Sequence, residues 1–178
     1  MSIIPENLAA DAGIPTQRLS LDLMTVAEVD ALIIQTRHPD WAEDFPQPTD
    51  YDAARQFFEA GLLGPAAATF GTRLIREIST TLVVGTIGFA GLPDEGTVEV
   101  SYNVAPSRQG QGYATEALVA LARFALTHPE VDAIIAYTEP GNDASQSLLL
   151  SAGFMPEEEN GLTLKFTLRR DQLPEASR

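Results

Sequence analysis

The chain has 178 residues, of which 44% are hydrophobic and 20% are charged. This length favours a single domain with its own core, and the composition is typical of a globular protein rather than a disordered one. Because 25 acidic residues face only 11 basic ones, the net charge is −14. Such a charge repels nucleic-acid backbones and anionic membrane surfaces, so we expect neither as a partner.

The chain has no cysteine, which excludes disulfides, thiolate metal sites and cysteine nucleophiles. Neither His38 nor His128 has sequence partners that would indicate a metal site, so we expect no metal. The N-terminus lacks the basic start, apolar core and cleavage site of a signal peptide, and no later stretch has the roughly 18 apolar residues of a membrane span. We therefore expect a cytoplasmic protein.

The first part of the chain predicts a strand followed by two helices. Residues 1–15 show no clear periodicity and are expected to form an irregular lead-in. Leu19, Leu21 and Leu23 alternate with polar residues, as in a strand with one buried face. Thr25 and Glu28 have the spacing of a capping box at the start of a helix. The elements expected here are a strand over 17–24, a helix over 26–36 and a helix over 51–62 capped by Thr49 or Asp50.

The second part predicts a meander of strands and then alternating helices and strands. β-branched and apolar runs separated by polar breaks indicate antiparallel strands. A strand, a long helix and a short apolar strand indicate a crossover that places two strands in parallel. The elements expected here are strands over 66–77, 80–90 and 97–104, a helix over 112–127, a strand over 131–137, a helix over 142–152, a strand over 162–168 and a polar tail over 171–178.

The residues that join the strand over 97–104 to the next helix have the features of an anion site. A helix N-terminus carries unpaired N–H groups and partial positive charge, and glycines allow a pyrophosphate to approach closely. Gly110 and Gly112 precede the helix, and Arg108 could add a charge-assisted contact. An ordinary turn would give the same glycine pair. The phosphate-loop motif is absent and the dinucleotide fingerprint is incomplete at Thr115, so neither usual nucleotide fold fits.

The run Arg108-Gln109-Gly110-Gln111-Gly112-Tyr113-Ala114 resembles the Q/R-x-x-G-x-G/A cofactor motif of the GCN5-related N-acetyltransferase (GNAT) superfamily. The stretches RHPDWAEDF, SYNVAPSRQGQGYATEAL and NDASQSLLLSAGF are most similar to the branch that contains the ribosomal-protein N-terminal acetyltransferases. The order of the expected elements over 16–168 also resembles that of the family. The resemblance implies an α/β (α+β) fold, with one acyltransferase domain over 16–170. Its mixed, mostly antiparallel sheet would be splayed where the cofactor enters and would carry helices on both faces.

The resemblance further implies direct transfer of an acetyl group from acetyl-CoA to a primary amine, without a covalent enzyme intermediate. A strand-end N–H at about Asn103 or Val104 would bind the developing oxyanion. The positions that the resemblance marks for cofactor contacts are Asn103, Val104, Arg108, Gln109, Gly110, Gln111, Gly112, Tyr113, Ala114, Thr115, Asn142 and Ser145.

Acid–base catalysis rests on two candidates. Glu99 lies in the middle of a strand on which the family often places its base, although it could equally be a solvent-facing strand residue. Ser145 lies where relatives polarise or protonate the leaving sulfur, and together with Asn142 it could instead cap a helix. Some relatives place an acidic tyrosine in this helix; here serines and a glutamine occupy the candidate positions, so the general acid is left open.

The acceptor substrate is the least defined part of the predicted reaction. Trp41 and Phe45 lie among acidic residues in a loop that could bind a cationic amine or could anchor itself on the core. Glu99 is a further candidate for contact with the acceptor. A protein N-terminus, a polyamine, an antibiotic amine or an amino-acid derivative would each fit. The alternatives are an acyltransferase for a longer acyl-CoA, a CoA-binding sensor without turnover, and a dinucleotide-binding module. A homodimer is possible, because dimers are frequent in the family.

Overall fold

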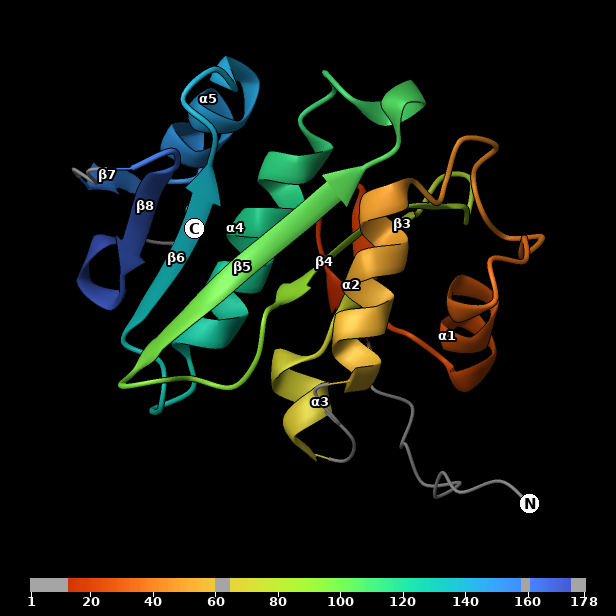
Figure 1. Cartoon of the computed structure of the whole chain (residues 1–178), viewed down its shortest axis with the longest axis horizontal. Helices are drawn as coiled ribbons and strands as arrows, with labels where there is room; N and C mark the ends of the chain where they lie inside the picture. The colour runs from red at the N-terminus through yellow and green to blue at the C-terminus, as the bar shows by residue number, and fades with distance from the viewer. Residues whose placement is uncertain (1–12, 60–64, 158–160, 174–178) are drawn as a thin grey trace.

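The computed structural model describes residues 13–59, 65–157 and 161–173. Eight strands form one sheet in the order β1-β2-β3-β4-β5-β6-β8-β7 (Figure 1). Every neighbouring pair is antiparallel except β5 and β6, which are parallel. The strands are β1 (Ile14–Pro15), β2 (Leu19–Leu23), β3 (Arg73–Glu77), β4 (Val83–Phe89), β5 (Thr97–Val104), β6 (Ala133–Thr138), β7 (Met155–Glu157) and β8 (Leu164–Arg169).

Helices cover both faces of this sheet. The helices are α1 (Val26–Ile33), α2 (Pro48–Glu59), α3 (Pro65–Phe70), α4 (Tyr113–Leu126) and α5 (Asp143–Ser151), with short 3-10 turns η1 (Pro106–Arg108) and η2 (Arg170–Gln172). In Figure 1, α1 and α2 lie in front of the sheet and α4 lies behind it. We call these the front and back faces. The expected mixed, mostly antiparallel sheet with helices on both faces is confirmed.

Helix α4 is held by an apolar stripe. Leu118, Leu121 and Ala125 recur at helical spacing and are completely buried. Burying a leucine side chain contributes about 1.5–3 kcal/mol, so this stripe is enough to fix the helix on the back of the sheet. Its position fixes where the loop from β5 into α4 lies.

The strands β5 and β6 separate toward their carboxyl ends. Their parallel register runs from Thr97 opposite Ala133 to Glu99 opposite Ile135. Strand β5 then continues to Val104 and β6 to Thr138, without further pairing between them in the part of the chain that is described. The expected splay therefore lies between β5 and β6.

Two expectations about the elements are wrong. The strand expected over 66–77 begins only at Arg73, because Pro65–Phe70 is helical. Proline at the first turn and a run of alanines both favour a helix. Helix α2 starts at Pro48, so Asp50 lies inside its first turn, where its carboxylate accepts the Gln47 N–H at 2.8 Å. Strands β1 and β7, with two and three residues, were not predicted because they are too short to show alternation.

Several expectations lie outside the described residues. They are most of the lead-in over 1–15, the end of the helix expected over 51–62, and most of the polar tail. Within the described ranges, no helix is long and apolar enough to cross a membrane. The same ranges contain no group of three or more histidine or acidic side chains arranged to hold a metal ion.

Candidate active site

The loop between β5 and α4 uses its two glycines for backbone conformations that other residues adopt rarely. Gly110 has φ of 71° and Gly112 has φ of 80°. Both values are in the left-handed region, which strains residues with a Cβ. A Cβ at Gly110 would point into open space. The glycines are therefore needed for the path of the chain, and the outer side of the loop is free.

Helix α4 starts directly after this loop. Its first turn closes with the Glu116 N–H donating to the Gly112 carbonyl at 3.0 Å, and no side chain caps it. The N–H groups of Tyr113, Ala114 and Thr115 therefore have no acceptor within the helix, and the helix dipole adds partial positive charge. This end of α4 can bind an anion.

Arg18, just before β2, holds the loop from behind. Its Nη1 donates to the Gln111 carbonyl at 2.8 Å and its Nε to the Glu116 carboxylate at 2.7 Å. The guanidinium also lies 4.6 Å from the centre of the Tyr113 ring. In a planar trans peptide the C=O and N–H point in opposite directions, so fixing the Gln111 carbonyl also fixes the Gly112 N–H. Sequence reasoning missed Arg18, which lies 93 positions before Gln111.

Arg108, expected near phosphate, is paired with protein groups. Its Nε lies 3.4 Å from a carboxylate oxygen of Glu77, which also accepts a hydrogen bond from the Tyr113 hydroxyl. Hydrogen bonds from Thr80 and Tyr113, together with the nearby Arg108 charge, hold the pKa of Glu77 below its usual value. Arg108 and Tyr113 thus anchor the two ends of the loop to β3.

The two glutamines of the loop also stabilise its conformation. Gln109 donates from Nε2 to the Val104 carbonyl at 2.8 Å, at the end of β5. Gln111 donates from its side chain to the Ser107 carbonyl at 3.3 Å. Both side chains are exposed and turn back onto the chain.

The backbone of β5 directs two N–H groups into the splay. The Ala105 N–H donates to the Val84 carbonyl, and the Ala90 N–H donates to the Glu99 carbonyl. The backbone N–H and C=O groups of residues 99, 101, 103 and 105 therefore point toward β4. The N–H groups of Tyr102 and Val104 point the other way, toward β6, beyond the last β5–β6 pair. Of the two candidates for the oxyanion donor, Val104 faces the splay and Asn103 faces β4.

On the back face, the start of α5 reaches β5 across the splay. The Tyr102 hydroxyl lies 3.0 Å from the Ser145 hydroxyl. Asn142 accepts the Ser145 N–H at 3.1 Å and so caps α5. Burial raises the pKa of Tyr102, although the hydrogen bond with Ser145 works against this. The sequence offered no pointer to Tyr102, because only the fold brings β5 next to the start of α5.

On the front face, Glu99 and Asn103 both lie on β5, and Asn103 contacts α2. The Glu99 side chain is exposed. Asn103 donates to Asp50 at 2.9 Å, and Thr86 donates to the same carboxylate, which is completely buried. Burial raises the pKa of Asp50 despite these hydrogen bonds. This group fixes α2 on β4 and β5, and Glu99 remains open to solvent.

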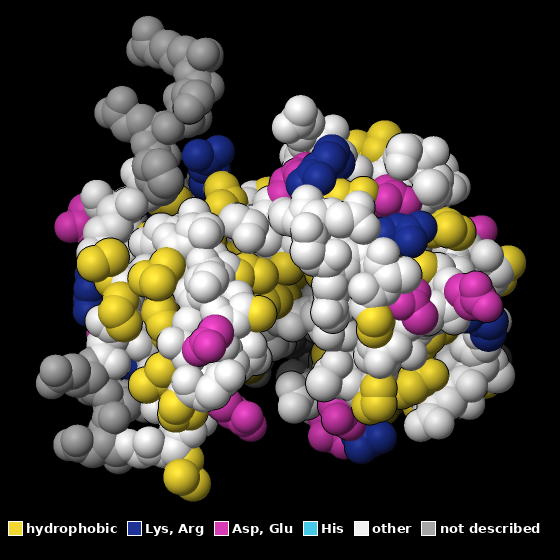
Figure 2. Space-filling model, turned by 90° about the horizontal axis from the view of Figure 1, so that it is seen from above, with side chains coloured by type: hydrophobic (Ala, Val, Ile, Leu, Met, Phe, Trp, Pro, Cys, Tyr) yellow, Lys and Arg dark blue, Asp and Glu magenta, His cyan; other side chains and the backbone are white. Residues whose placement is uncertain are grey.

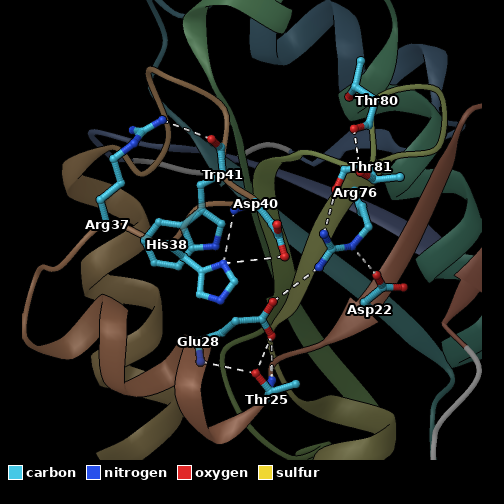
Figure 3. A network of polar contacts seen from close by, with 10 residues as sticks. All are labelled: Asp22, Thr25, Glu28, Arg37, His38, Asp40, Trp41, Arg76, Thr80 and Thr81. Atoms are coloured by element: carbon cyan, nitrogen blue, oxygen red, sulfur yellow. Dashed lines mark hydrogen bonds and ion pairs between the residues drawn. The ribbon is translucent and has the colours of Figure 1, made fainter.

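Trp41 and Phe45 are core residues. Their exposed fractions are 2% and 1%. Their rings pack edge to face, with the ring centres 5.3 Å apart. Arg37 donates to the carbonyl groups of Trp41, Ala42 and Glu43, and Figure 3 shows it reaching Trp41 beside the ring of His38. The aromatic rings therefore anchor the loop, which is the second of the two readings that the sequence allowed.

Asp44 joins this front loop to the loop that follows β5. It accepts the Ser107 N–H and the Ser107 hydroxyl, both at 2.7 Å. These two bonds lower the pKa of Asp44.

Figure 2 looks onto the end of the molecule toward which β5 and β6 point, and shows a hollow between two lobes.

Comparison with known proteins agrees with this geometry. The family model described as an acetyltransferase (GNAT) domain matches residues 18–155. The chain is 29% identical to p20 of Bacillus licheniformis, an uncharacterized N-acetyltransferase, over 147 residues, which is 80% of this chain and 82% of p20. It is 30% identical to YjdG of Bacillus subtilis (strain 168), also an uncharacterized N-acetyltransferase, over 113 residues, which is 63% of this chain and 67% of YjdG.

Solved structures share the fold. RimL, a ribosomal L7/L12 alpha-N-protein acetyltransferase solved in complex with coenzyme A, superposes with a TM-score of 0.65 at 20% identity, covering 88% of this chain and 97% of RimL. At this identity the likeness concerns the fold alone. With a family model that matches most of the chain, this protein belongs to the GNAT family of acetyltransferases.

Proposed function

We propose that this acetyltransferase moves the acetyl group of acetyl-CoA directly to a primary amine, in the cytoplasm. The observation that carries the proposal is the splay between β5 and β6, which opens beside the glycine loop and the free N-terminus of α4. Together they offer a slot for a thin acyl-pantetheine arm and an anion site for its pyrophosphate. The RimL structure, which shares the fold, holds coenzyme A.

The cofactor residues divide by what each can offer. Gly110 and Gly112 give close access, and the N–H groups of Tyr113 to Thr115 face the pyrophosphate. Arg108, Gln109, Gln111 and Arg18 support the loop through protein contacts. The Val104 N–H, which points into the splay, is the best placed donor for the oxyanion that forms at the thioester.

The two catalytic groups approach from opposite faces of β5. Glu99 is exposed on the front face and takes the proton of the amine, directly or through one water. Ser145 lies on the back face at the start of α5 and serves the leaving sulfur. Attack from the front and departure toward the back would keep the acceptor and the CoA thiol on separate sides of the strand.

The acceptor is a primary amine of a protein N-terminus or of a small molecule. Both kinds occur among proteins with this fold, because RimL acts on ribosomal L7/L12 and SpeG of Vibrio cholerae is a spermidine N-acetyltransferase. A net charge of −14 favours cationic acceptors of either kind. With Trp41 and Phe45 buried, the exposed Glu99 is the candidate for contact with the amine.

Isothermal titration with acetyl-CoA, followed by a panel of amines, tests the proposal. Wild type should bind acetyl-CoA and not NAD, and Gly110→Val should weaken binding because a branched side chain would strain the loop and block its outer side. Gly141→Val is the matched control, since a Cβ there also meets open space and no left-handed φ is required.

The panel should contain spermidine, a peptide with a free N-terminus and its blocked counterpart, with acetyl-CoA and a longer acyl-CoA as donors. Release of free thiol together with acetylated amine supports the proposal. A folded wild type that binds acetyl-CoA and acetylates no amine would indicate a sensor instead. A preference for the longer donor would move the assignment to another acyl group.

A further inference from the structure

We propose that Tyr102 is the source of the proton that the departing CoA thiolate takes up, and that the Ser145 hydroxyl passes this proton on to the sulfur. The inference rests on the proposed acetyl transfer. It fills the place that the sequence left open, because the helix α5 contains no tyrosine at its start and β5 supplies one instead.

The position of Tyr102 follows from the alternation of β5. Val98, Val100 and Val104 share its face of the strand and are buried on the back side, with α4. From this face Tyr102 meets Ser145 at 3.0 Å. The contact joins β5 to α5 over the stretch in which β5 no longer pairs with β6. Both hydroxyls therefore border the proposed slot for the acyl arm.

Ser145 is held in place by more than this one contact. Its N–H is bound by Asn142, which fixes the first turn of α5. The helix start also carries partial positive charge, which stabilises a thiolate as it forms. A serine oriented in this way can pass a proton, since its hydroxyl donates one and accepts another.

The acidities of the groups favour tyrosine as the source of the proton. A free tyrosine has a pKa of about 10 and a cysteine-like thiol about 8.5, so transfer from phenol to thiolate is uphill by about 1.5 pKa units. Burial raises the pKa of Tyr102 and so makes the transfer more uphill than for the free groups. An alkyl hydroxyl is a far weaker acid, and Ser145 alone would face a larger barrier. Coupled to Tyr102, the serine can give up its proton while it receives another.

The proton balance of the step is closed. The amine nitrogen bonds to the acetyl carbon and its proton passes to Glu99 or water. The C–S bond breaks with its electron pair on sulfur, which takes the Ser145 proton as Ser145 takes the Tyr102 proton. The phenolate left on Tyr102 regains a proton from solvent, and the products are the amide and CoA with a free thiol.

Tyr102→Phe is the central test, because it removes the hydroxyl and keeps the ring that packs in the core. We expect kcat to fall about 100-fold, the lower end of the range for proton transfer by a positioned side chain. The dissociation constant for acetyl-CoA should stay that of wild type, because an interaction made only in the transition state does not contribute to binding of the ground state. Burial raises the pKa of Tyr102, so wild-type kcat should decline only in strongly alkaline buffer, and the variant should lose that decline.

Four further variants separate a proton relay from packing. The kcat of Ser145→Ala and of the double variant Tyr102→Phe/Ser145→Ala should fall no further than that of Tyr102→Phe, because the effects of residues that act as one unit are not additive. Tyr51→Phe and Ser147→Ala remove the same atoms from α2 and from the exposed side of α5, and should keep wild-type rates.

The outcomes distinguish this inference from the function on which it rests. A wild type that acetylates no amine contradicts both. An active wild type whose Tyr102→Phe variant keeps full kcat and the alkaline decline contradicts the role of Tyr102 alone. A variant that loses acetyl-CoA binding as strongly as turnover also contradicts it, because the hydroxyl would then be structural.

Discussion

Arg18 and Glu116 are 98 positions apart, and their side chains form an ion pair of 2.7 Å that joins the start of β2 to the first turn of α4. The Arg18 backbone N–H donates to the same carboxylate at 2.8 Å. Since Arg18 also binds the Gln111 carbonyl, the edge of the sheet, the glycine loop and the helix start form one unit. This unit presents the backbone N–H groups that we propose for the pyrophosphate.

The first prediction concerns Arg18. Arg18→Ala should raise the dissociation constant for acetyl-CoA about 10-fold, the loss expected for one charge-assisted hydrogen bond, because the Gln111 peptide is then free to turn. Arg18→Lys should also bind weakly, since one ammonium group cannot reproduce the forked contacts of a guanidinium. Titration calorimetry measures both constants.

Arg55 provides the control for charge. It is an exposed arginine of α2 whose ion pair with Asp52 spans 3.7 Å. Arg55→Ala changes the net charge by the same amount as Arg18→Ala and should leave acetyl-CoA binding unchanged. Equal losses in the two variants would mean that overall charge, and not the geometry of the loop, is responsible.

The second prediction concerns Gly112. A left-handed conformation costs a residue with a Cβ about 1–2 kcal/mol, so Gly112→Ala should reduce the free energy of unfolding by about that amount and weaken acetyl-CoA binding. A Cβ there would also lie 3.4 Å from Arg18, an ordinary contact, so strain of the backbone dominates. Denaturant unfolding checks the first effect and calorimetry the second; Gly141→Ala should change neither.

The strands and long helices could be predicted because their signals are local. The capping box of Thr25 and Glu28 is present in α1, and the helix expected over 112–127 is found as α4. The segment over 66–72 was mistaken because its alanines and Phe70 are apolar in either conformation. Strand β7 is stabilised by pairing with β8. This pairing is a tertiary effect that cannot be predicted from the three residues of β7 alone.

The site was predictable where it is continuous in the chain. The glycine loop, Asn142 and Ser145 are each part of a local motif. Arg18 and Tyr102 were missed because their partners lie 93 and 43 positions away, and only folding brings them together. Trp41 and Phe45 lie in a continuous stretch of the chain, yet the sequence did not decide their role. The acidic residues around them suggested an exposed site, whereas both rings are buried.

The third prediction concerns Glu99. Glu99→Gln should lower kcat/KM for the amine by about 100-fold or more, as expected for loss of a general base, while acetyl-CoA binding and thermal stability stay unchanged because the side chain is exposed. Steady-state rates at saturating acetyl-CoA measure the effect. Glu130→Gln, an exposed glutamate after α4, is the matched control. Full activity in Glu99→Gln would exclude Glu99 as the base.

The last prediction concerns Glu77 and acid. Hydrogen bonds from Thr80 and Tyr113 and the charge of Arg108 keep its pKa below the ordinary value of 4.5 in the folded state. A carboxylate with a lowered folded pKa stabilises the fold above its unfolded pKa, and this contribution is lost as the pH falls toward the folded pKa.

Urea unfolding of wild type and Glu77→Gln at neutral pH and at about pH 3.5, below the ordinary glutamate value, measures this contribution. At neutral pH the variant should be less stable, because the amide is uncharged and its pairing with Arg108 is lost. At the lower pH the difference should shrink, since Glu77 then takes up a proton in the unfolded wild-type chain more readily than in the folded one, which favours unfolding. Because Glu77 binds both Tyr113 and Arg108, the variant should also bind acetyl-CoA more weakly. A stability difference that does not vary with pH would show that shape, and not charge, ties the loop to β3.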